Sequence, residues 1–366
     1  MSHRIWTETT VARQLGISIP IVQGPFGGNF STARLTATVS NCGGLGSFGA
    51  QAFPAAEIRS IIADIRAQTS KPFAINLWVS TRDEMDESVM RANFQTQIKF
   101  LKPFCEDMEI PLPNFPKPSG ETFEQQVEAV LDLRPPVLSF VFGIPAPEIL
   151  HECRRRNIVT VGAATTVAEA LVNEAAGVDI VVATGSDAGG HRPSFLKSAE
   201  ASLTGTMSLL PQVADAVKIP VIAAGGIADG RGVVAALKLG AGAVQIGTAF
   251  LACEESGASA FHKSQLFGGN AIETILTRAC TGRLARFIRN RFITEWERSA
   301  VSPLPFPLQN ELTAGLRAAA VQQQRADLAA LYAGQAASLL KHRQAETLFR
   351  SLVEDTNQHW GICSKG

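Results

Sequence analysis

The sequence predicts an α/β fold, specifically a (β/α)8 TIM barrel with an additional, mainly helical substrate or cap domain. Short apolar runs alternate with segments of helical period over the first ~250 residues, and the count of apolar runs reaches eight. The runs are continuously apolar, as is typical of parallel strands buried on both faces. A doubly wound open sheet is the competing fold, but no G-x-G-x-x-G follows the first run, which weakens the dinucleotide-binding form of that fold.

The elements expected of the barrel follow in regular order. The expected strands are 19–24, 43–49, 72–80, 137–143, 158–165, 179–186, 220–226 and 243–248. The helical segments between them are 31–42, 54–69, 145–157, 166–177, 204–217 and 229–240. In the second of these segments Ile58, Ile61, Ile62 and Ile65 share one face, as a helical period requires.

Two stretches do not fit this rhythm. Residues 81–120 are charged at first and then Pro-rich, and residues 251–366 follow the last strand. We therefore expect a barrel domain over residues 1–250 with an insertion at about 81–120, and a C-terminal helical cap or substrate region over 251–366. The Ala-rich stretch 310–343 fits an antiparallel helical pack in this cap. A helix pair closing the barrel bottom and the face of a homodimer are the open alternatives.

Composition excludes several classes of protein. The formal net charge is zero, so there is no basic surface for nucleic acid. No apolar stretch has the length of a membrane span, and the first residues lack the apolar core of a signal peptide. The six cysteines form no C-x-x-C pair, which is typical of reduced thiols in a cytoplasmic protein. We expect a cytoplasmic enzyme with a small-molecule substrate.

Glycine-rich loops follow the seventh and eighth strands. Active sites in this fold lie at the carboxyl ends of the strands, and the loops after strands seven and eight often bind phosphate. Gly225, Gly226 and Gly247 let backbone amides approach an anion closely, and Thr248 adds a hydroxyl. The alternative is that these glycines only turn the chain, but two such loops in these positions favour a phosphorylated ligand.

The other strand ends indicate which ligand carries that phosphate. They are poor in Lys and acidic residues, which a sugar phosphate would require, and rich in apolar and amide groups. Asn76 and Gln245 can each donate to and accept from a heterocycle. This pattern fits the isoalloxazine ring of FMN. No metal is expected, because His191 has no partner ligand at a metal-binding spacing.

The segment after the sixth strand, TGSDAGGHRPSF, places an imidazole beside that ring. Gly189 and Gly190 allow close backbone contact, and His191 can take a substrate proton or hold an anionic substrate. The alternative for His191 is a structural hydrogen bond to backbone. Asp187 either serves the site or anchors the turn through its own loop amides. The other histidines are expected at the surface: 3, 151, 262, 342 and 359.

Several of these blocks resemble the nitronate monooxygenase family, formerly called 2-nitropropane dioxygenases. They are GSDAGGHRPSF, VIAAGGIADGRG and AVQIGTAFLACEESGA, with PIVQGPFGG, GGLGSFGA, FAINLWVS, FGIP, TRACTGRLARFIRNRF and LYAGQAASLL. The resemblance runs from about residue 16 to 340. It implies an FMN-bound barrel with a helical substrate domain, in which alkyl nitronates are oxidised by O2 to a carbonyl compound and nitrite.

The resemblance also implies site residues. His191 matches the catalytic histidine. The residues that match FMN contacts are Gln23, Gly24, Pro25, Phe26, Asn76, Gly189, Gly226, Gln245, Ile246, Gly247 and Thr248. To these we add Gly190 and Gly225 from the loops described above.

This chain departs from the family pattern at three places. Phe26 stands where Met is usual, and Thr184 stands at a cofactor-contact position that is often Gln. Phe306-Pro307 replaces a Tyr-Pro, and Tyr332 is the single tyrosine of the chain. A phenylalanine keeps the apolar wall but loses the phenol donor. A nitronate would then be held by His191 and backbone amides.

Three functions remain open on the sequence. The first is a flavin monooxygenase acting on small alkyl nitronates. The second is an NAD(P)H-dependent FMN reductase acting on a quinone or an enoyl thioester, since a nicotinamide needs only an open flavin face. The third is a flavin-binding or oligomeric protein without turnover, against which an intact His191 argues.

Overall fold

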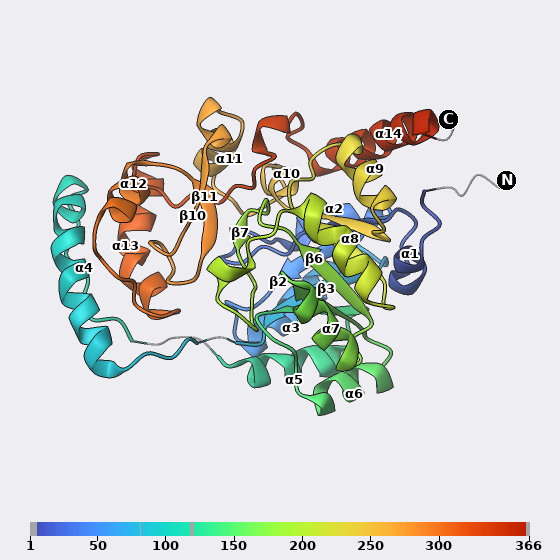
Figure 1. Cartoon of the computed structure of the whole chain (residues 1–366), viewed down its shortest axis with the longest axis horizontal. Coiled ribbons are helices and arrows are strands. Elements are labelled where there is room, and N and C mark those ends of the chain that lie inside the picture. Colours follow the sequence, from blue (N-terminus) through green and yellow to red (C-terminus); the bar gives the residue numbers. More distant parts are fainter. Residues whose placement is uncertain (1–5, 81, 118–120, 364–366) are drawn as a thin grey trace.

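The structure is a computed structural model that describes residues 6–80, 82–117 and 121–363. Its centre is a barrel of eight parallel strands, which confirms the expected fold class (Figure 1). Every strand lies within an apolar run predicted from the sequence. The strands are β1 (Ile21–Gln23), β2 (Gly46–Gly49), β3 (Phe73–Trp78), β4 (Val137–Val141), β5 (Val159–Ala164), β6 (Ile180–Thr184), β8 (Val221–Ala224) and β9 (Ala243–Ile246).

Backbone hydrogen bonds close these strands into a ring. The order is β1-β9-β8-β6-β5-β4-β3-β2, and the free edge of β1 meets the residue just before β2. The amide of Leu45 donates to the carbonyl of Ile21 at 3.0 Å, and the amide of Gln23 donates to the carbonyl of Leu45 at 2.9 Å. An open doubly wound sheet is therefore excluded.

The interior of the barrel is packed with side chains and closed at its floor by α1 (Thr10–Leu15). Val11, Ala12 and Leu15 of this helix belong to the same buried cluster as inward-facing residues of the strands. Such filling makes the barrel a solid core. The Ala-rich C-terminal stretch is therefore not needed to close the barrel bottom.

Helices cover the outside of the ring. They are α2 (Ala33–Asn41), α3 (Ala55–Gln68), α5 (Phe123–Leu133), α6 (Pro147–Arg155), α7 (Val167–Ala175), α8 (Thr206–Ala216) and α9 (Gly230–Lys238). After β9 there is only the short α10 (Thr248–Leu251), which leaves the outer ring incomplete between α9 and α2.

The C-terminal helix α14 (Ala345–Cys363) fills that gap. It packs against α9 and α2, and Leu348, Phe349 and Leu352 are buried in the cluster that holds Leu35 of α2 and Val233 of α9 (Figure 1). The assignment of all of 251–366 to a cap is wrong at this end. Because no long barrel helix follows β9, the apolar faces of α2 and α9 would be exposed on this side, and α14 covers them.

The cap is built from the insertion and the chain between α10 and α14. It contains α4 (Glu87–Asp107), α11 (Ala260–Leu266), α12 (Arg291–Arg298) and α13 (Leu308–Gln322), with short 3-10 turns at Gly269–Ile272 and Ala337–Leu339. A further 3-10 turn, Ala199–Ser202, lies in the segment between the barrel elements β6 and α8. A three-stranded sheet joins β10 (Thr274–Thr277), β11 (Ala285–Ile288) and β7 (Gly190–His191). Phe104 of α4 packs on Phe292 of α12, so both stretches share one core. Residues 81 and 118–120 of the insertion lie outside the described residues.

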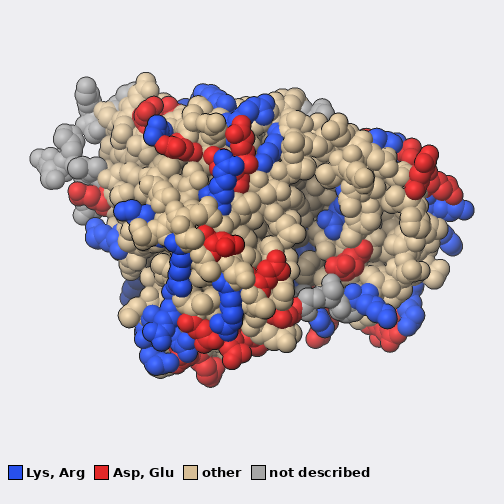
Figure 2. Space-filling model, turned by 180° about the vertical axis from the view of Figure 1, so that it is seen from behind, with Lys and Arg blue, Asp and Glu red and all other residues tan. Residues whose placement is uncertain are grey.

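Surface charge and cysteines agree with the composition. Basic and acidic side chains intermingle on the face seen in Figure 2, and neither sign dominates it. The five cysteines whose side chains are described form no disulfide. Within the described ranges, no helix has the length and apolarity needed to cross a membrane.

Replacement of Phe349 by Ala tests the position of α14. This side chain is 2% exposed, and its loss should lower the free energy of unfolding by about 3–5 kcal/mol, as large-to-small changes in a core do. Urea unfolding followed by circular dichroism measures the change. The matched control is Glu354→Ala on the exposed side of the same helix, which should change stability little. Equal effects of the two variants would contradict the assignment of α14 to the barrel.

Candidate active site

A cavity of about 880 Å³ lies at the carboxyl ends of the barrel strands, between the barrel and the cap. Strand-end loops form its barrel side, and residues of α13 and the segment around Tyr332 form its cap side. This is the position at which barrels of this fold carry their active sites. The predicted site residues that line it are Gly24, Pro25, Phe26, Asn76, Thr184, Gly189, Gly190, His191, Gly225, Gly226, Gln245, Gly247 and Thr248.

Two predicted contacts, Gln23 and Ile246, do not line the cavity. Both are buried completely. The side-chain oxygen of Gln23 accepts from the amide of Ser47 at 3.0 Å, and the carbonyl of Ile246 accepts from the amide of Gly24 at 2.8 Å. They hold β1 against its neighbouring strands, so they shape the floor of the site.

The loop after β8 presents bare backbone to the cavity. Gly225 has φ of +119° and Gly226 has φ of +68°, conformations that glycine adopts without strain. A Cβ at Gly225 would lie 2.5 Å from the hydroxyl of Thr206. Among the described residues, the amides of Gly226 and Ile227 have no hydrogen-bond acceptor. This loop and the residues Gly247 and Thr248 after the adjacent β9 fit the phosphate of a flavin nucleotide.

Asp187 anchors the neighbouring loop. Its carboxylate accepts from the amide of Thr206, the first residue of α8, at 2.5 Å. The side chain is not part of the cavity lining. Of the two roles considered for Asp187, the structure thus favours the anchor, although the amide it binds belongs to α8 and not to its own loop.

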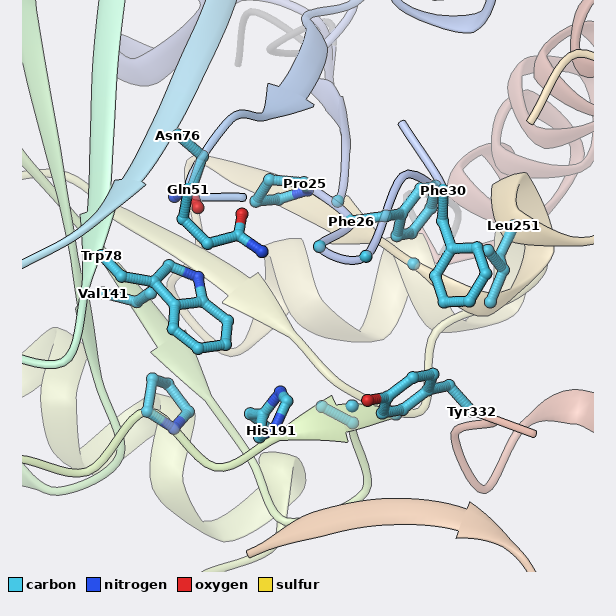
Figure 3. A pocket seen from close by; sticks show the side chains of 18 of the residues that line it. Pro25, Phe26, Phe30, Gln51, Asn76, Trp78, Val141, His191, Leu251 and Tyr332 are labelled. Atoms are coloured by element: carbon cyan, nitrogen blue, oxygen red, sulfur yellow. The ribbon is translucent and has the colours of Figure 1, made fainter. Parts of the chain in front are cut away.

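Three side-chain amides from the barrel side face the cavity. Asn76 donates to the hydroxyl of Ser139 at 3.0 Å, and Gln245 lies at the end of β9. The third, Gln51, was missed in the sequence although it follows β2, where strand-end residues are sought. Its side-chain oxygen is buried without a hydrogen-bond partner among the described residues, and the amide points into the cavity (Figure 3). A buried amide oxygen without a partner fits a ligand that donates a hydrogen bond.

His191 is fixed by the cap. Gly190 and His191 form β7, which pairs antiparallel with Arg286 and Ala285 of β11. The ring Nε2 lies 3.0 Å from the hydroxyl oxygen of Thr281, and this hydroxyl donates to the carbonyl of Arg283 at 3.1 Å. The Thr281 hydrogen is therefore in use, so Nε2–H of His191 donates to Thr281. In the neutral ring this leaves Nδ1 as the acceptor, and no described residue bonds to it.

Aromatic rings and two arginines surround this imidazole. The centroids of Trp78, Phe142, Phe306 and Tyr332 lie 5.2, 6.2, 6.4 and 6.0 Å from that of His191. Figure 3 shows Trp78 and Tyr332 on either side of the imidazole. Burial, followed by the positive charges of Arg283 and Arg317, lowers the pKa of His191 from 6.5 to about 3. The imidazole is therefore neutral at neutral pH.

The two arginines near His191 differ in their partners. Arg283 is 5% exposed and forms an ion pair with Asp83 at 2.6 Å, with its guanidinium 4.1 Å from the ring centroid of Phe142. Arg317 lines the cavity and forms no ion pair with a described carboxylate. Neither arginine was singled out in the sequence, since both lie in the cap, far along the chain from the strand ends.

Tyr332 and His262 form the support beside the site. Burial raises the pKa of Tyr332 to about 12, so the phenol keeps its hydrogen, and its hydroxyl points toward His191 (Figure 3). The ring Nε2 of His262 donates to the main-chain carbonyl of Tyr332 at 2.9 Å. The expectation that His262 lies at the surface is wrong, because it is 2% exposed. His3 lies outside the described residues.

The described part of the chain contains no group of three or more His, Cys, Asp or Glu side chains that could hold a metal ion. The site instead combines a bare-backbone loop, three amides and a neutral imidazole in an aromatic cage. Such a cavity can bind a phosphorylated heterocycle at one end and a small substrate beside His191 at the other.

Comparisons with known proteins identify similar chains. Residues 8–355 match the family model described as nitronate monooxygenase. A protein of Staphylococcus aureus (strain Newman) named probable nitronate monooxygenase is 37% identical, over 97% of this chain and 99% of that protein. Among solved structures, a nitroalkane oxidase from Streptomyces ansochromogenes has a TM-score of 0.88 and 35% identity, covering 96% of this chain and 99% of its own. FabK from Thermotoga maritima has a TM-score of 0.76 and 27% identity, covering 98% and 99%.

His262 should make stability depend on pH. Burial lowers its pKa from 6.5 to about 4. In the unfolded chain this histidine therefore becomes protonated below about pH 6.5, whereas in the folded chain it becomes protonated only below about pH 4. Stability should therefore fall as the pH falls through this window, by about 3 kcal/mol from this group. In His262→Asn the loss between pH 7 and pH 4 should be smaller by that amount in urea unfolding. The exposed His151→Asn is the control, and an equal pH dependence in both variants would contradict the assignment.

Proposed function

The chain belongs to the nitronate monooxygenase family, as the resemblance predicted, and from this membership we propose that it binds FMN and oxidises small alkyl nitronates with O2 to a carbonyl compound and nitrite. Family membership makes it a flavin-dependent oxidoreductase. The observation that supports the proposal most is the neutral His191, with a free Nδ1, at the end of a cavity whose other end is the glycine loop.

The residues present fit FMN. The phosphate would lie against Gly225, Gly226, Gly247 and Thr248, where unpaired amides and the absence of Cβ atoms leave room. The ring would lie among the side-chain amides that the barrel presents to the cavity, which are Asn76, Gln51 and Gln245. The partnerless oxygen of Gln51 would then accept from a ring N–H. When bound, FMN supplies the electron transfer between substrate and oxygen.

The low pKa of His191 favours a substrate that arrives already deprotonated. A base with a pKa of about 3 takes a proton from a neutral nitroalkane poorly at neutral pH. A nitronate has already lost that proton. An anion beside Nδ1 raises the pKa of the imidazole, because it stabilises the protonated ring. Binding of the anion and proton uptake at Nδ1 of His191 are therefore coupled.

The cage around His191 keeps water from the reacting atoms. Trp78, Phe142 and Phe306 present apolar ring surface, and the Arg283–Asp83 pair closes the space behind them. Phe306 forms this wall without a phenol, so of the tyrosine hydroxyls expected in the family only that of Tyr332 faces the cavity. The chain's side-chain donors toward a substrate are correspondingly few.

Replacement of His191 by Asn tests the function. The purified holoenzyme should consume O2 and release nitrite and acetone from propyl-2-nitronate, and His191→Asn should keep its FMN while turnover falls roughly 10²–10⁴-fold, as for a positioned acid or base. Nitrite release and oxygen uptake measure this. The control is His262→Asn, a buried histidine that does not line the cavity, which should keep most of its turnover.

Two outcomes contradict the proposal. Unchanged turnover in His191→Asn would remove the catalytic role of the imidazole. Rapid anaerobic bleaching of the flavin by NADH or NADPH, with no nitrite from the nitronate in air, would replace the monooxygenase by a reductase acting on a quinone or enoyl thioester.

Replacement of Gly226 by Ala tests the phosphate loop. Positive φ makes Ala unfavourable there, and the added methyl group would lie 3.3 Å from Cβ of Asp187, the residue that anchors the neighbouring loop. Gly177→Ala is matched, because Gly177 has φ of +82° but lies in the turn between α7 and β6, away from the cavity. Both variants should lose about 1 kcal/mol of stability, but only Gly226→Ala should weaken FMN, about tenfold or more. Flavin fluorescence titration measures this, and equal FMN affinities in the two variants would contradict the phosphate assignment.

A further inference from the structure

We propose that Arg317 binds the anionic group of the substrate, an inference that rests on the proposed function of the same site. If Arg317 has this role, the substrate is a planar oxyanion that carries a small apolar substituent. The residue lies on α13, on the cap side of the cavity opposite the glycine loop, and its guanidinium is one of the few charged groups of the cavity lining.

The hydrogen bonds of Arg317 leave one end of its guanidinium open. Nε donates to the hydroxyl of Thr313 at 3.0 Å, and Nη2 donates to the carbonyl and side-chain oxygens of Asn310 at 2.9 and 2.8 Å. All three acceptors are neutral, and no described carboxylate forms an ion pair with Arg317. Its charge is therefore not neutralised by a partner, and the two hydrogens of Nη1 have no acceptor among the described residues.

The charge of Arg317 acts on the groups that would surround the substrate. It lowers the pKa of His191, and it opposes the rise that burial causes in the pKa of Tyr332 and of Cys280. Arg317, His191 and Tyr332 also line the same cavity, so one ligand there can meet all three. Arg283 cannot take this role, because Asp83 pairs with it and it does not line the cavity.

One loop holds both the cation and the imidazole in place. The hydroxyl of Thr313 donates to the carbonyl of Cys280 at 2.6 Å while it accepts from Arg317. The next residue, Thr281, accepts from His191. Arg317 and His191 are therefore positioned by consecutive residues of the chain, so a two-oxygen anion meets a fixed pair of groups and little rotamer entropy is lost on binding.

The chemistry of this pair selects the ligand. A neutral His191 with a free Nδ1 cannot neutralise an anion by itself, whereas a guanidinium binds planar oxyanions through parallel N–H groups. Beyond Arg317 the same face of α13 presents Ala314, Ala318 and Val321 to the cavity. These residues offer apolar surface to an alkyl substituent and no further charge.

Binding of a non-reacting anion to the FMN-loaded enzyme tests the inference. Isobutyrate has the planar oxyanion and branched alkyl group of propyl-2-nitronate, and isobutyramide is its neutral counterpart. Calorimetry should show that the wild-type enzyme binds isobutyrate and not isobutyramide. Arg317→Met should weaken isobutyrate roughly 10–100-fold, the worth of a hydrogen bond to a charged group, and raise KM for the nitronate by a similar factor with less change in kcat. Arg317→Lys should fall between.

The control is Glu311→Gln, which removes the other charged side chain that α13 presents to the cavity. It should leave isobutyrate affinity unchanged or improved. Unchanged isobutyrate affinity in Arg317→Met, or its absence in the wild type, overturns the inference. Failure to oxidise nitronates in a wild type whose isobutyrate binding depends on Arg317 overturns the proposed function alone. If Arg317→Met does not bind FMN or does not fold, the isobutyrate affinity of Arg317→Lys is compared with that of the wild type instead.

Discussion

The site depends on one segment, the loop after β6, being bonded to the barrel and the cap at once. Gly190 and His191 are the edge strand of the cap sheet, yet they follow a barrel strand directly. Arg192 is 2% exposed and donates to the carbonyls of Thr184 and Ser202, and Arg286 of β11 donates to the carbonyl of Ser186. These charge-assisted bonds to carbonyls hold the glycine-rich loop that delivers the imidazole, since glycine itself gives the backbone no preference.

Because β7 and β11 are paired, the cap also determines which charges lie near His191. The cap brings two guanidinium groups toward an imidazole whose pKa burial already lowers, so the ring stays neutral. The guanidinium of Arg283 forms an ion pair with Asp83 and packs on aromatic rings, whereas Arg317 lines the cavity. A guanidinium that has no ion-pair partner among the described residues is unfavourable in an apolar enclosure without a ligand and favourable with an anionic one. If Arg317 binds the substrate as proposed, selectivity for an anion arises from the cap.

The sequence predicts the barrel side of this arrangement well and the cap side poorly. Continuous apolar runs and glycines at strand ends are local signals, so the eight barrel strands and residues such as Gly226 and Gln245 can be found by inspection. The short strand β7 carries no such signal. Arg317 and Thr281 reach the cavity only through the packing of α13 and the loop at Cys280, which no local pattern reports. His262 looks like a helix-surface residue, and only the tertiary contact with Tyr332 buries it. The position of α14 likewise depends on a gap left by another element.

This division between barrel and cap separates two properties of the enzyme. At the strand ends, backbone amides and side-chain amides would contact the proposed cofactor. Contacts from the backbone do not depend on side-chain identity, so many substitutions leave them intact. The residues that orient His191, shield it and carry open charge come from the cap, namely Thr281, Arg283, Phe306, Arg317 and Tyr332. Replacement of a phenol by Phe306 therefore changes the substrate end without touching the phosphate loop. Substrate range in this fold can shift through the cap while the cofactor end stays the same, provided that β7 and β11 remain paired.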